Sequence, residues 1–81
     1  MAKDILMPRL GYDMTEGKLI RWLKDEGASV KAGEAIFEVE ADKVTLEIEA
    51  FDAGILQHIL REGETAAVGE RIGVLIVPGE Q

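Results

Sequence analysis

The sequence predicts a small all-β domain, and three observations support this fold class. Apolar residues recur at a spacing near two, which is typical of strands with one buried face and not of an amphipathic helix. The best helical candidate, residues 18–25, lies between glycines, lacks a good N-cap, and contains Ile20 and Trp22, which favour strands. Glycines also separate the short apolar runs, at Gly11, Gly27, Gly33, Gly54, Gly63 and Gly69.

Eight short strands are expected. Their predicted ranges are residues 4–7, 17–24, 29–31, 35–41, 44–50, 54–61, 66–68 and 71–77. With 81 residues the chain is long enough for one small domain, which we place at residues 1–77. Residues 78–81, Pro-Gly-Glu-Gln, look like the start of an interdomain linker, so we expect the natural protein to continue into other domains with this piece at its N-terminus.

An internal repeat predicts how the strands are arranged. The run from Gly17 to Leu23 aligns with the run from Gly54 to Leu60, at an offset of 37 residues. After a slip of one residue, Glu26-Gly27 aligns with Glu62-Gly63, and Gly33-Glu34-Ala35-Ile36 aligns with Gly69-Glu70-Arg71-Ile72. Two copies are too few for a solenoid. The repeat therefore predicts a closed sandwich of two similar sheets related by a pseudo-two-fold axis.

Composition excludes several classes of function. The formal net charge is −7, from 16 acidic and 9 basic residues, which argues against nucleic acid and against an anionic membrane surface as partners. There is no cysteine, hence no disulfide, no thiol nucleophile and no Cys-ligated metal, and the acidic residues show no metal-ligand spacing. No apolar run is long enough to span a bilayer, and the first residues do not resemble a signal peptide. We expect a monomeric domain in the cytoplasm or the mitochondrial matrix, with no catalytic residues of its own.

The centre of the chain predicts a β-hairpin whose two-residue turn is Asp42-Lys43. With this turn every apolar residue faces an apolar one and every polar residue faces a polar one, and moving the turn by one residue breaks the match. Asp-Lys is not a favoured hairpin turn, and local rules broken at a tip often mark function. The predicted cross-strand pairs are Ala41 with Val44, Val39 with Leu46, Phe37 with Ile48, Glu40 with Thr45, and Glu38 with Glu47, the last of which is a like-charge pair.

A family resemblance predicts a function for the hairpin lysine. The stretch Glu40-Ala41-Asp42-Lys43-Val44 resembles the Glu-Thr-Asp-Lys-Ala/Val signature of lipoyl domains in the acyltransferase component of 2-oxo acid dehydrogenase complexes. Further matches cover nearly the whole chain, from about Asp4 to Val77. They are Met7-Pro8-x-Leu10-Gly11-x-x-Met14-x-Glu16-Gly17, Trp22-Leu23-Lys24-x-Glu26-Gly27-x-x-Val30-x-x-Gly33-Glu34, Gly54-x-Leu56, and Gly69 followed by Ile72.

The resemblance implies a flattened β-barrel of two four-stranded antiparallel sheets, with lipoic acid attached covalently to Lys43 at the exposed turn. It also implies that Asp42 and Val44 flank the modified lysine and that Glu40 is used by the lipoylating enzyme. A surface loop near the lipoyl-lysine would help the decarboxylase component to recognise its domain. The loop residues are Arg9, Leu10, Gly11, Tyr12, Asp13, Met14, Thr15 and Glu16.

The same resemblance implies a carrier function. Lipoate on Lys43 would act as a swinging arm that accepts an acyl group from a thiamine-diphosphate decarboxylase and delivers it to the acyltransferase catalytic domain for transfer to coenzyme A. Dihydrolipoyl dehydrogenase would then reoxidise the arm, and a lipoate ligase or lipoyl transferase would have attached it. The cofactor and the partner enzymes would supply the chemistry of the reaction. The Met14-x-Glu16-Gly17 opening favours a pyruvate-type complex.

Three alternatives are weighed against this reading. A biotinyl carrier domain of a carboxylase typically places methionine on both sides of its lysine, whereas Asp42 and Val44 stand here. The glycine-cleavage carrier protein is longer and lacks the opening motif, and an unmodified structural sandwich has no need of a lysine at the tip. The sequence gives little support for an enzyme. The one histidine, His58, aligns with Arg21 in the repeat, so a packing or surface role is predicted for it and not catalysis.

Overall fold

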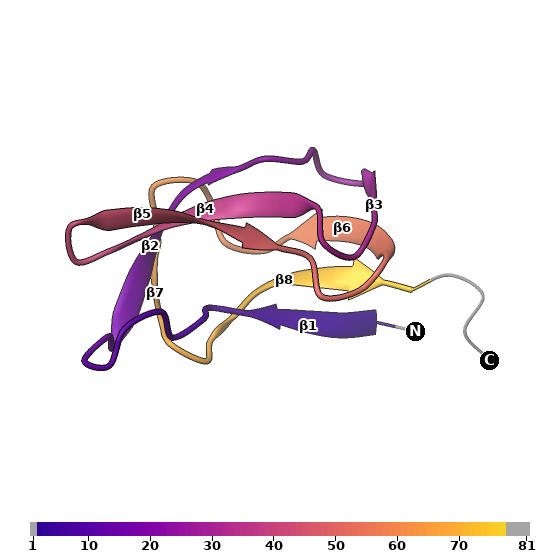
Figure 1. Ribbon diagram of the computed structural model, residues 1–81. Coiled ribbons are helices and arrows are strands. Elements are labelled where there is room, and N and C mark those ends of the chain that lie inside the picture. The colour runs from indigo at the N-terminus through magenta and orange to yellow at the C-terminus, as the bar shows by residue number, and fades with distance from the viewer. Residues whose placement is uncertain (1, 78–81) are drawn as a thin grey trace.

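The computed structural model describes residues 2–77 and shows eight strands in two four-stranded antiparallel sheets (Figure 1). The predicted linker at residues 78–81 lies outside the described residues. The strands are β1 (Ala2–Leu6), β2 (Glu16–Trp22), β3 (Ser29–Val30), β4 (Ala35–Ala41), β5 (Val44–Glu49), β6 (Gly54–His58), β7 (Thr65–Ala67) and β8 (Arg71–Ile76). Within residues 2–77 no helix is long and apolar enough to cross a membrane.

The strand order confirms the predicted pseudo-two-fold relation and shows that the two halves interlock. One sheet has the order β1-β8-β6-β3 and the other has the order β5-β4-β2-β7. Exchanging β1 to β4 with β5 to β8 converts one order into the other. Each sheet therefore takes two strands from each half of the chain, and neither half can complete a sheet alone.

The repeated turns explain why the two halves carry glycine at matching places. Gly27 and Gly63 have φ angles of 83° and 89°, in the left-handed region that glycine adopts without a Cβ penalty. In each turn the glycine N–H donates across to the other half of the chain, Gly27 to the Leu56 carbonyl at 2.7 Å and Gly63 to the Leu19 carbonyl at 2.7 Å. The sequence repeat is thus a repeat of backbone geometry.

The repeat alignment needs one correction, because the one-residue slip lies inside β2. Leu19 pairs with Val39 and Arg21 pairs with Glu38, so Ile20 is an extra residue that shifts the register. After this bulge the offset between the halves is 36, and His58 matches Trp22. The predicted match of His58 with Arg21 was therefore wrong by one position.

Two predicted strands run two or more residues past the observed ends. The range 17–24 ends at Trp22, whose N–H donates to the Glu62 carboxylate at 2.8 Å, although the Leu23 N–H still donates to the Ile36 carbonyl of β4 at 2.8 Å. The range 54–61 ends at His58, where the Ile59 and Leu60 N–H groups both approach the Ile72 carbonyl, at 3.0 Å each, and the ladder stops. Side-chain acceptors and shared carbonyls of this kind leave little trace in hydrophobic spacing.

A single apolar core lies between the sheets. Inward-facing residues of both sheets supply its fully buried side chains, with Phe37 and Ile36 from β4 packed among them. No charged or polar residue is buried among residues 2–77, and none of the buried side-chain polar atoms there lacks a partner. The largest fully buried side chains are Phe37, Met7, Leu19, Ile36, Leu56, Ile72, Leu75, Val30 and Val39.

Candidate functional site at the hairpin tip

The β4–β5 hairpin has the predicted register. Its turn consists of Asp42 and Lys43, and the residues on either side of the turn, Ala41 and Val44, face each other. The remaining pairs are Val39 with Leu46, Phe37 with Ile48, Glu40 with Thr45, and Glu38 with Glu47. All five predicted pairs are confirmed, so matching of polar and apolar residues is sufficient to define this element.

The turn itself is strained in a way that suits its sequence. Asp42 has φ 58° and is the only non-glycine residue with positive φ in the described part of the chain. Two-residue hairpin turns need positive φ at one or both central positions, because the twist of the turn then matches that of the strands. Aspartate tolerates this left-handed conformation better than most residues that carry a Cβ.

Lys43 is exposed at the end of the hairpin. Its side chain makes no hydrogen bond or ion pair with any of the residues 2–77 described by the structure. The hairpin tip lies at one end of an elongated molecule that measures 39 × 20 × 20 Å, and the paired ends of β1 and β8, Ala2 and Ile76, lie at the other end (Figure 1). The lysine amine is therefore accessible, and it lies far from Ala2 and Ile76.

Charged residues on the outer face of the hairpin are partly compensated. The predicted like-charge pair of Glu38 and Glu47 exists, but Arg21 Nε donates to Glu38 Oε1 at 2.9 Å. This hydrogen bond, reinforced by the Glu38 charge, raises the pKa of Arg21 above its usual value. Glu40 lies between Lys18 on β2 and Thr45 on β5 in the sheet. Arg21 thus relieves the repulsion that the sequence alone suggested.

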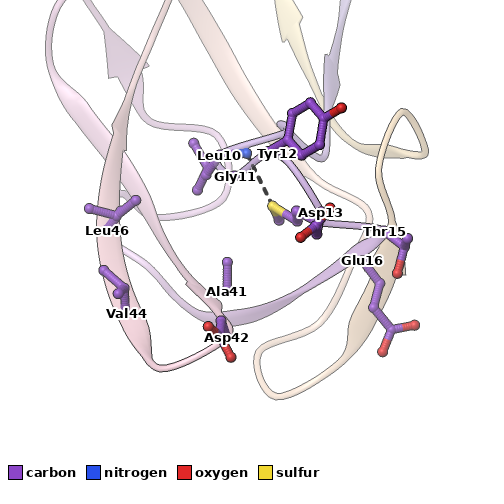
Figure 2. A pocket seen from close by; sticks show the side chains of 11 residues that line it. Leu10, Gly11, Tyr12, Asp13, Thr15, Glu16, Ala41, Asp42, Val44 and Leu46 are labelled. Carbon is purple, nitrogen blue, oxygen red and sulfur yellow. Dashed lines mark hydrogen bonds between the residues drawn. The ribbon is translucent and has the colours of Figure 1, made fainter.

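The loop between β1 and β2 lies against the hairpin. Together they enclose an open groove of about 650 Å³ with the hairpin on one side and the loop on the other (Figure 2). The groove is lined by Leu10, Gly11, Tyr12, Asp13, Met14 and Thr15 from the loop and Glu16 at the start of β2, and by Ala41, Asp42, Val44 and Leu46 from the hairpin. The structure therefore brings all but one of the predicted loop residues close to Asp42 and Val44. Arg9 and Glu40 do not line the groove.

Sequence reasoning missed two hairpin residues of this groove. Ala41 and Leu46 were identified as inward-facing members of the hairpin, yet not as part of a site. The signal was present, since both belong to the apolar face of the hairpin near its tip. What the sequence could not show is that the sandwich leaves this part of the face uncovered.

Met14 fixes the conformation of the loop. The Leu10 N–H points at the Met14 sulfur at 3.1 Å, as drawn in Figure 2, and the Met14 N–H donates to the Gly11 carbonyl at 3.1 Å. The Met14 side chain is buried over Gly17, where a Cβ would lie 2.8 Å from Met14 Cε. Gly17 therefore has no room for a side chain, and the loop is pinned to the core beside the hairpin.

The remaining candidate residues have structural partners. The His58 ring stacks on Trp22, with centroids 4.2 Å apart and planes at 5°. His58 Nε2 lies 2.9 Å from the Lys24 carbonyl, an acceptor, so this nitrogen carries the proton. Trp22 Nε1 donates to the Leu60 carbonyl at 2.9 Å. These contacts agree with the predicted packing role of His58. No group of three or more His, Cys, Asp or Glu residues that could hold a metal ion occurs within residues 2–77.

The donor set at the tip fits a group that is attached covalently. The Lys43 amine is exposed and has no partner among residues 2–77, so acylation would break no contact within the described structure. A two-sheet sandwich that presents a lysine at the tip of its central hairpin is the arrangement that the sequence resemblance implies for a domain with a group attached to that lysine. The fold and the site thus agree with the class of carrier domain that the sequence resemblance implies.

Comparisons with known proteins make the class specific. The family model described as "Biotin-requiring enzyme" (Biotin_lipoyl) matches residues 3–75. The solution structure of the lipoyl domain of the 2-oxoglutarate dehydrogenase complex from Azotobacter vinelandii is similar, with a TM-score of 0.77 and 34% identity. The alignment covers 94% of this chain and 98% of that one. The chain belongs to this biotinyl and lipoyl family, and within it the chain is a lipoyl domain.

Relatives of greater length share the same segment. The acetyltransferase component of the pyruvate dehydrogenase complex of Rickettsia conorii is 49% identical over 100% of this chain, and the match covers 20% of that relative. The succinyltransferase component of the 2-oxoglutarate dehydrogenase complex of Staphylococcus saprophyticus is 45% identical over 89% of this chain and is covered to 17%. The chain thus spans about a fifth of the length of these curated relatives, and it matches only their lipoyl part.

Proposed function

We propose that this domain carries lipoate as an amide on Lys43 and serves as the mobile acyl carrier of a 2-oxo acid dehydrogenase complex. The observation that carries the proposal is the position of Lys43, exposed and without a partner in residues 2–77, at the tip of a hairpin in a lipoyl domain. Lipoate, when attached, supplies a reducible disulfide that accepts and releases acyl groups. The domain is a non-catalytic part of the acyltransferase, and the partners supply the catalysis.

The residues of this chain position and present the lysine. The β4–β5 ladder and the Asp42 turn hold the Lys43 backbone at the end of the molecule, so the amine reaches an incoming active site without a clash from the body of the domain. Asp42 and Val44 lie on either side of Lys43. Glu40 lies two residues before Asp42, on the outer face of β4. We assign these three residues to recognition by the lipoate ligase or lipoyl transferase.

The groove beside the tip offers a surface by which partners would distinguish this domain. The loop from Arg9 to Glu16 is fixed against the hairpin through Met14. We assign this loop to recognition by the thiamine-diphosphate decarboxylase component, and we expect the acyltransferase catalytic domain and dihydrolipoyl dehydrogenase to act on the same arm. Tethering would raise the effective concentration of the arm at each of these enzymes.

A pyruvate-type complex is the proposed setting. Most of the relatives with the highest similarity are named as acetyltransferase components of pyruvate dehydrogenase complexes, although a 2-oxoglutarate relative of similar identity occurs among them. The named relatives come from bacteria and from a chloroplast, so the expected location in the bacterial cytoplasm or the mitochondrial matrix stays a prediction.

The test is reductive acylation of the lipoylated domain. The holo-domain would be incubated with a bacterial pyruvate decarboxylase component, thiamine diphosphate and labelled pyruvate, and in parallel with the 2-oxoglutarate component and its own substrate. We expect acetylation that is at least about tenfold faster than succinylation, which corresponds to a preference near 1.4 kcal/mol in transition-state free energy. Lys43→Arg keeps the charge and the turn and serves as the matched control, with no acylation expected.

Other outcomes would revise the proposal in distinct ways. Faster succinylation would assign the domain to a 2-oxoglutarate complex and leave the carrier role intact. Acylation of the Lys43→Arg protein would place the arm on another lysine. No acylation by either component, on a domain that carries lipoate, would overturn the acyl-carrier function.

A further inference from the structure

The two ends of the molecule differ although the fold is pseudo-symmetric. Leu46 pairs with Val39 on β4, and Lys3 pairs with Leu75 on β8. Since Val39 and Leu75 are related by the offset of 36, Leu46 and Lys3 are equivalent positions in the two halves. At one end, Lys3 Nζ makes an ion pair of 2.5 Å with Asp52, in the connection between β5 and β6. At the hairpin end, Leu46 faces the open groove.

The two equivalent connections also differ in length. Met7 and Ala50 are equivalent, because each exchanges hydrogen bonds with the matching turn of the other half, Met7 with Glu70 and Gly69 and Ala50 with Glu34 and Gly33. The path from Met7 to Gly17 is ten residues and that from Ala50 to Gly54 is four, so the first connection carries six more residues. These extra residues form the loop wall of the groove. The symmetry is therefore broken at the end that carries Lys43.

The hairpin side of the groove is apolar and incompletely covered. Val44 and Leu46 belong to the inward face of the hairpin, yet they are 52% and 39% exposed. Tyr12, at the loop wall, is 92% exposed. Apolar side chains on the inner face of a sandwich are ordinarily covered by the opposite sheet. Here the opposite sheet ends short of the tip, and the apolar surface is left open beside Lys43.

We propose that the groove between the loop and the hairpin is a docking site for the lipoyl group carried on Lys43 of the same chain. The inference rests on the proposed lipoylation of Lys43. The two neighbours of Lys43 in sequence, Asp42 and Val44, both line the groove, so the arm begins at its rim. A lipoyl-lysine arm spans roughly 10–15 Å at ordinary bond lengths and can fold back along a groove of this size. The resting arm is therefore bound to its own domain, and it leaves the groove to reach a partner enzyme.

The charges around the groove select this occupant. Asp13, Glu16 and Asp42 line it, and no lysine or arginine does. Acidic groups at the rim disfavour free carboxylates and phosphates, which excludes free lipoate and coenzyme A as natural occupants. Acylation of Lys43 yields a neutral amide with an apolar chain and a dithiolane ring. An uncharged, apolar, tethered group is the ligand that an apolar floor with an acidic rim accepts.

The groove is preformed because its loop wall is fixed. The Leu10 N–H contact with the Met14 sulfur and the Val68 N–H bond to the Thr15 carbonyl, at 3.0 Å, hold both ends of the wall. The groove itself therefore loses little conformational entropy when the arm docks. The docked arm would bury apolar atoms of Val44, Leu46 and Leu10 that water otherwise contacts.

The test compares the apo-domain and the lipoylated domain by NMR. Lipoate would be attached by a lipoate ligase, and intact mass would confirm one lipoyl group. We expect nuclear Overhauser contacts from the arm to the methyl groups of Val44 and Leu46, together with chemical-shift changes confined to the groove and the tip. If the arm of a lipoylated domain contacts no groove residue, the docking site is overturned and the carrier function is not affected. Failure of lipoate to attach would overturn both.

A second readout measures protection of the ring. A water-soluble phosphine reduces the dithiolane only when the arm is undocked, so a docked fraction of about two thirds slows reduction roughly threefold. Leu46→Thr keeps a β-favouring residue and removes apolar surface from the groove, and we expect it to restore the faster rate. Phe51→Thr, at an exposed apolar residue in the β5–β6 connection, is the matched control and should leave the rate unchanged. Equal rates for the unaltered domain and the Leu46→Thr variant, both folded, would contradict docking.

Discussion

Asp42 shows how a single residue sets the geometry of the site. Its φ of 58° turns the chain so that Ala41 and Val44 pair and Lys43 stands at the tip. The sequence flagged Asp-Lys as an unusual turn, and the structure gives the reason, since the strained position falls on a residue that tolerates it. The positive φ of the turn therefore falls on Asp42 and not on Lys43.

Substitutions at Asp42 should separate backbone strain from side-chain chemistry. Asp42→Ala forces a Cβ residue with no local hydrogen-bonding group into the left-handed region, so we expect the free energy of unfolding to fall by about 1 kcal/mol. Asp42→Gly accepts positive φ, so its cost should be smaller than that of alanine. Urea denaturation followed by circular dichroism measures both. A glycine variant less stable than the alanine variant would contradict the assigned turn geometry.

At the scale of elements, the two halves are joined by a reciprocal pair of contacts. Glu62 accepts a hydrogen bond from the Trp22 N–H at 2.8 Å, and Glu26 accepts one from the His58 N–H at 2.6 Å. Trp22 and His58 occupy equivalent positions, and their rings stack on each other. The pseudo-two-fold axis thus passes between two aromatic rings, each at a strand end closed by a glutamate from the turn of the other half.

Removing the His58 ring tests this junction. His58→Ala loses the stack on Trp22 and the contact with the Lys24 carbonyl, so we expect a loss of about 1 kcal/mol in the free energy of unfolding. His58→Phe keeps an aromatic ring and loses only the polar contact, so it should cost less. Thermal and urea unfolding at pH 7 would measure both variants. Equal costs for the two variants would show that stacking contributes nothing to the junction.

The elements themselves could be predicted well from the sequence, for a physical reason. Alternation of polar and apolar residues defines the β4–β5 register because one slip would turn every side chain to the wrong face. The bulge at Ile20 could not be predicted, because its neighbours on both sides remain compatible with either alignment of the repeat. The strand ends at Trp22 and His58 escaped prediction as well, since side-chain acceptors from a distant turn close them.

At the scale of the whole molecule, the candidate site was only half visible in the sequence. Lys43 and the loop could be identified from motifs, but the groove exists because two connections of unequal length lie at opposite ends of a pseudo-symmetric sandwich. That arrangement depends on the interlocking of the halves, which no local pattern encodes. Ala41 and Leu46 were therefore assigned to the hairpin face and not to the site.

Stability of the whole domain should depend on acidic pH. The backbone N–H of Lys31 lowers the pKa of Glu34, and the Lys3 ammonium lowers the pKa of Asp52. A carboxyl whose pKa is lower in the folded state stabilises that state above its unfolded pKa, and the contribution is lost as pH falls through the folded value. We therefore expect urea midpoints to be constant from pH 7 to about 5 and to decrease below about pH 4.

Neutral variants identify the groups responsible for this pH dependence. Because both carboxyl side chains are more than a third exposed, each contribution is small and screened by salt. The double variant Glu34→Gln with Asp52→Asn should show a shallower decrease between pH 5 and pH 3 than the unaltered domain. An unchanged slope would assign the acid sensitivity to other carboxyls.

The central claim is that Lys43 is the attachment site of lipoate, and mass spectrometry tests it most directly. The domain would be incubated with a lipoate ligase, lipoate and ATP, and in parallel with a biotin ligase and biotin, followed by intact mass and peptide mapping. We predict one lipoyl group, on Lys43, none on the Lys43→Arg variant, and no biotin. Biotin on Lys43, lipoate on another lysine, or a folded domain that neither enzyme modifies would contradict the account.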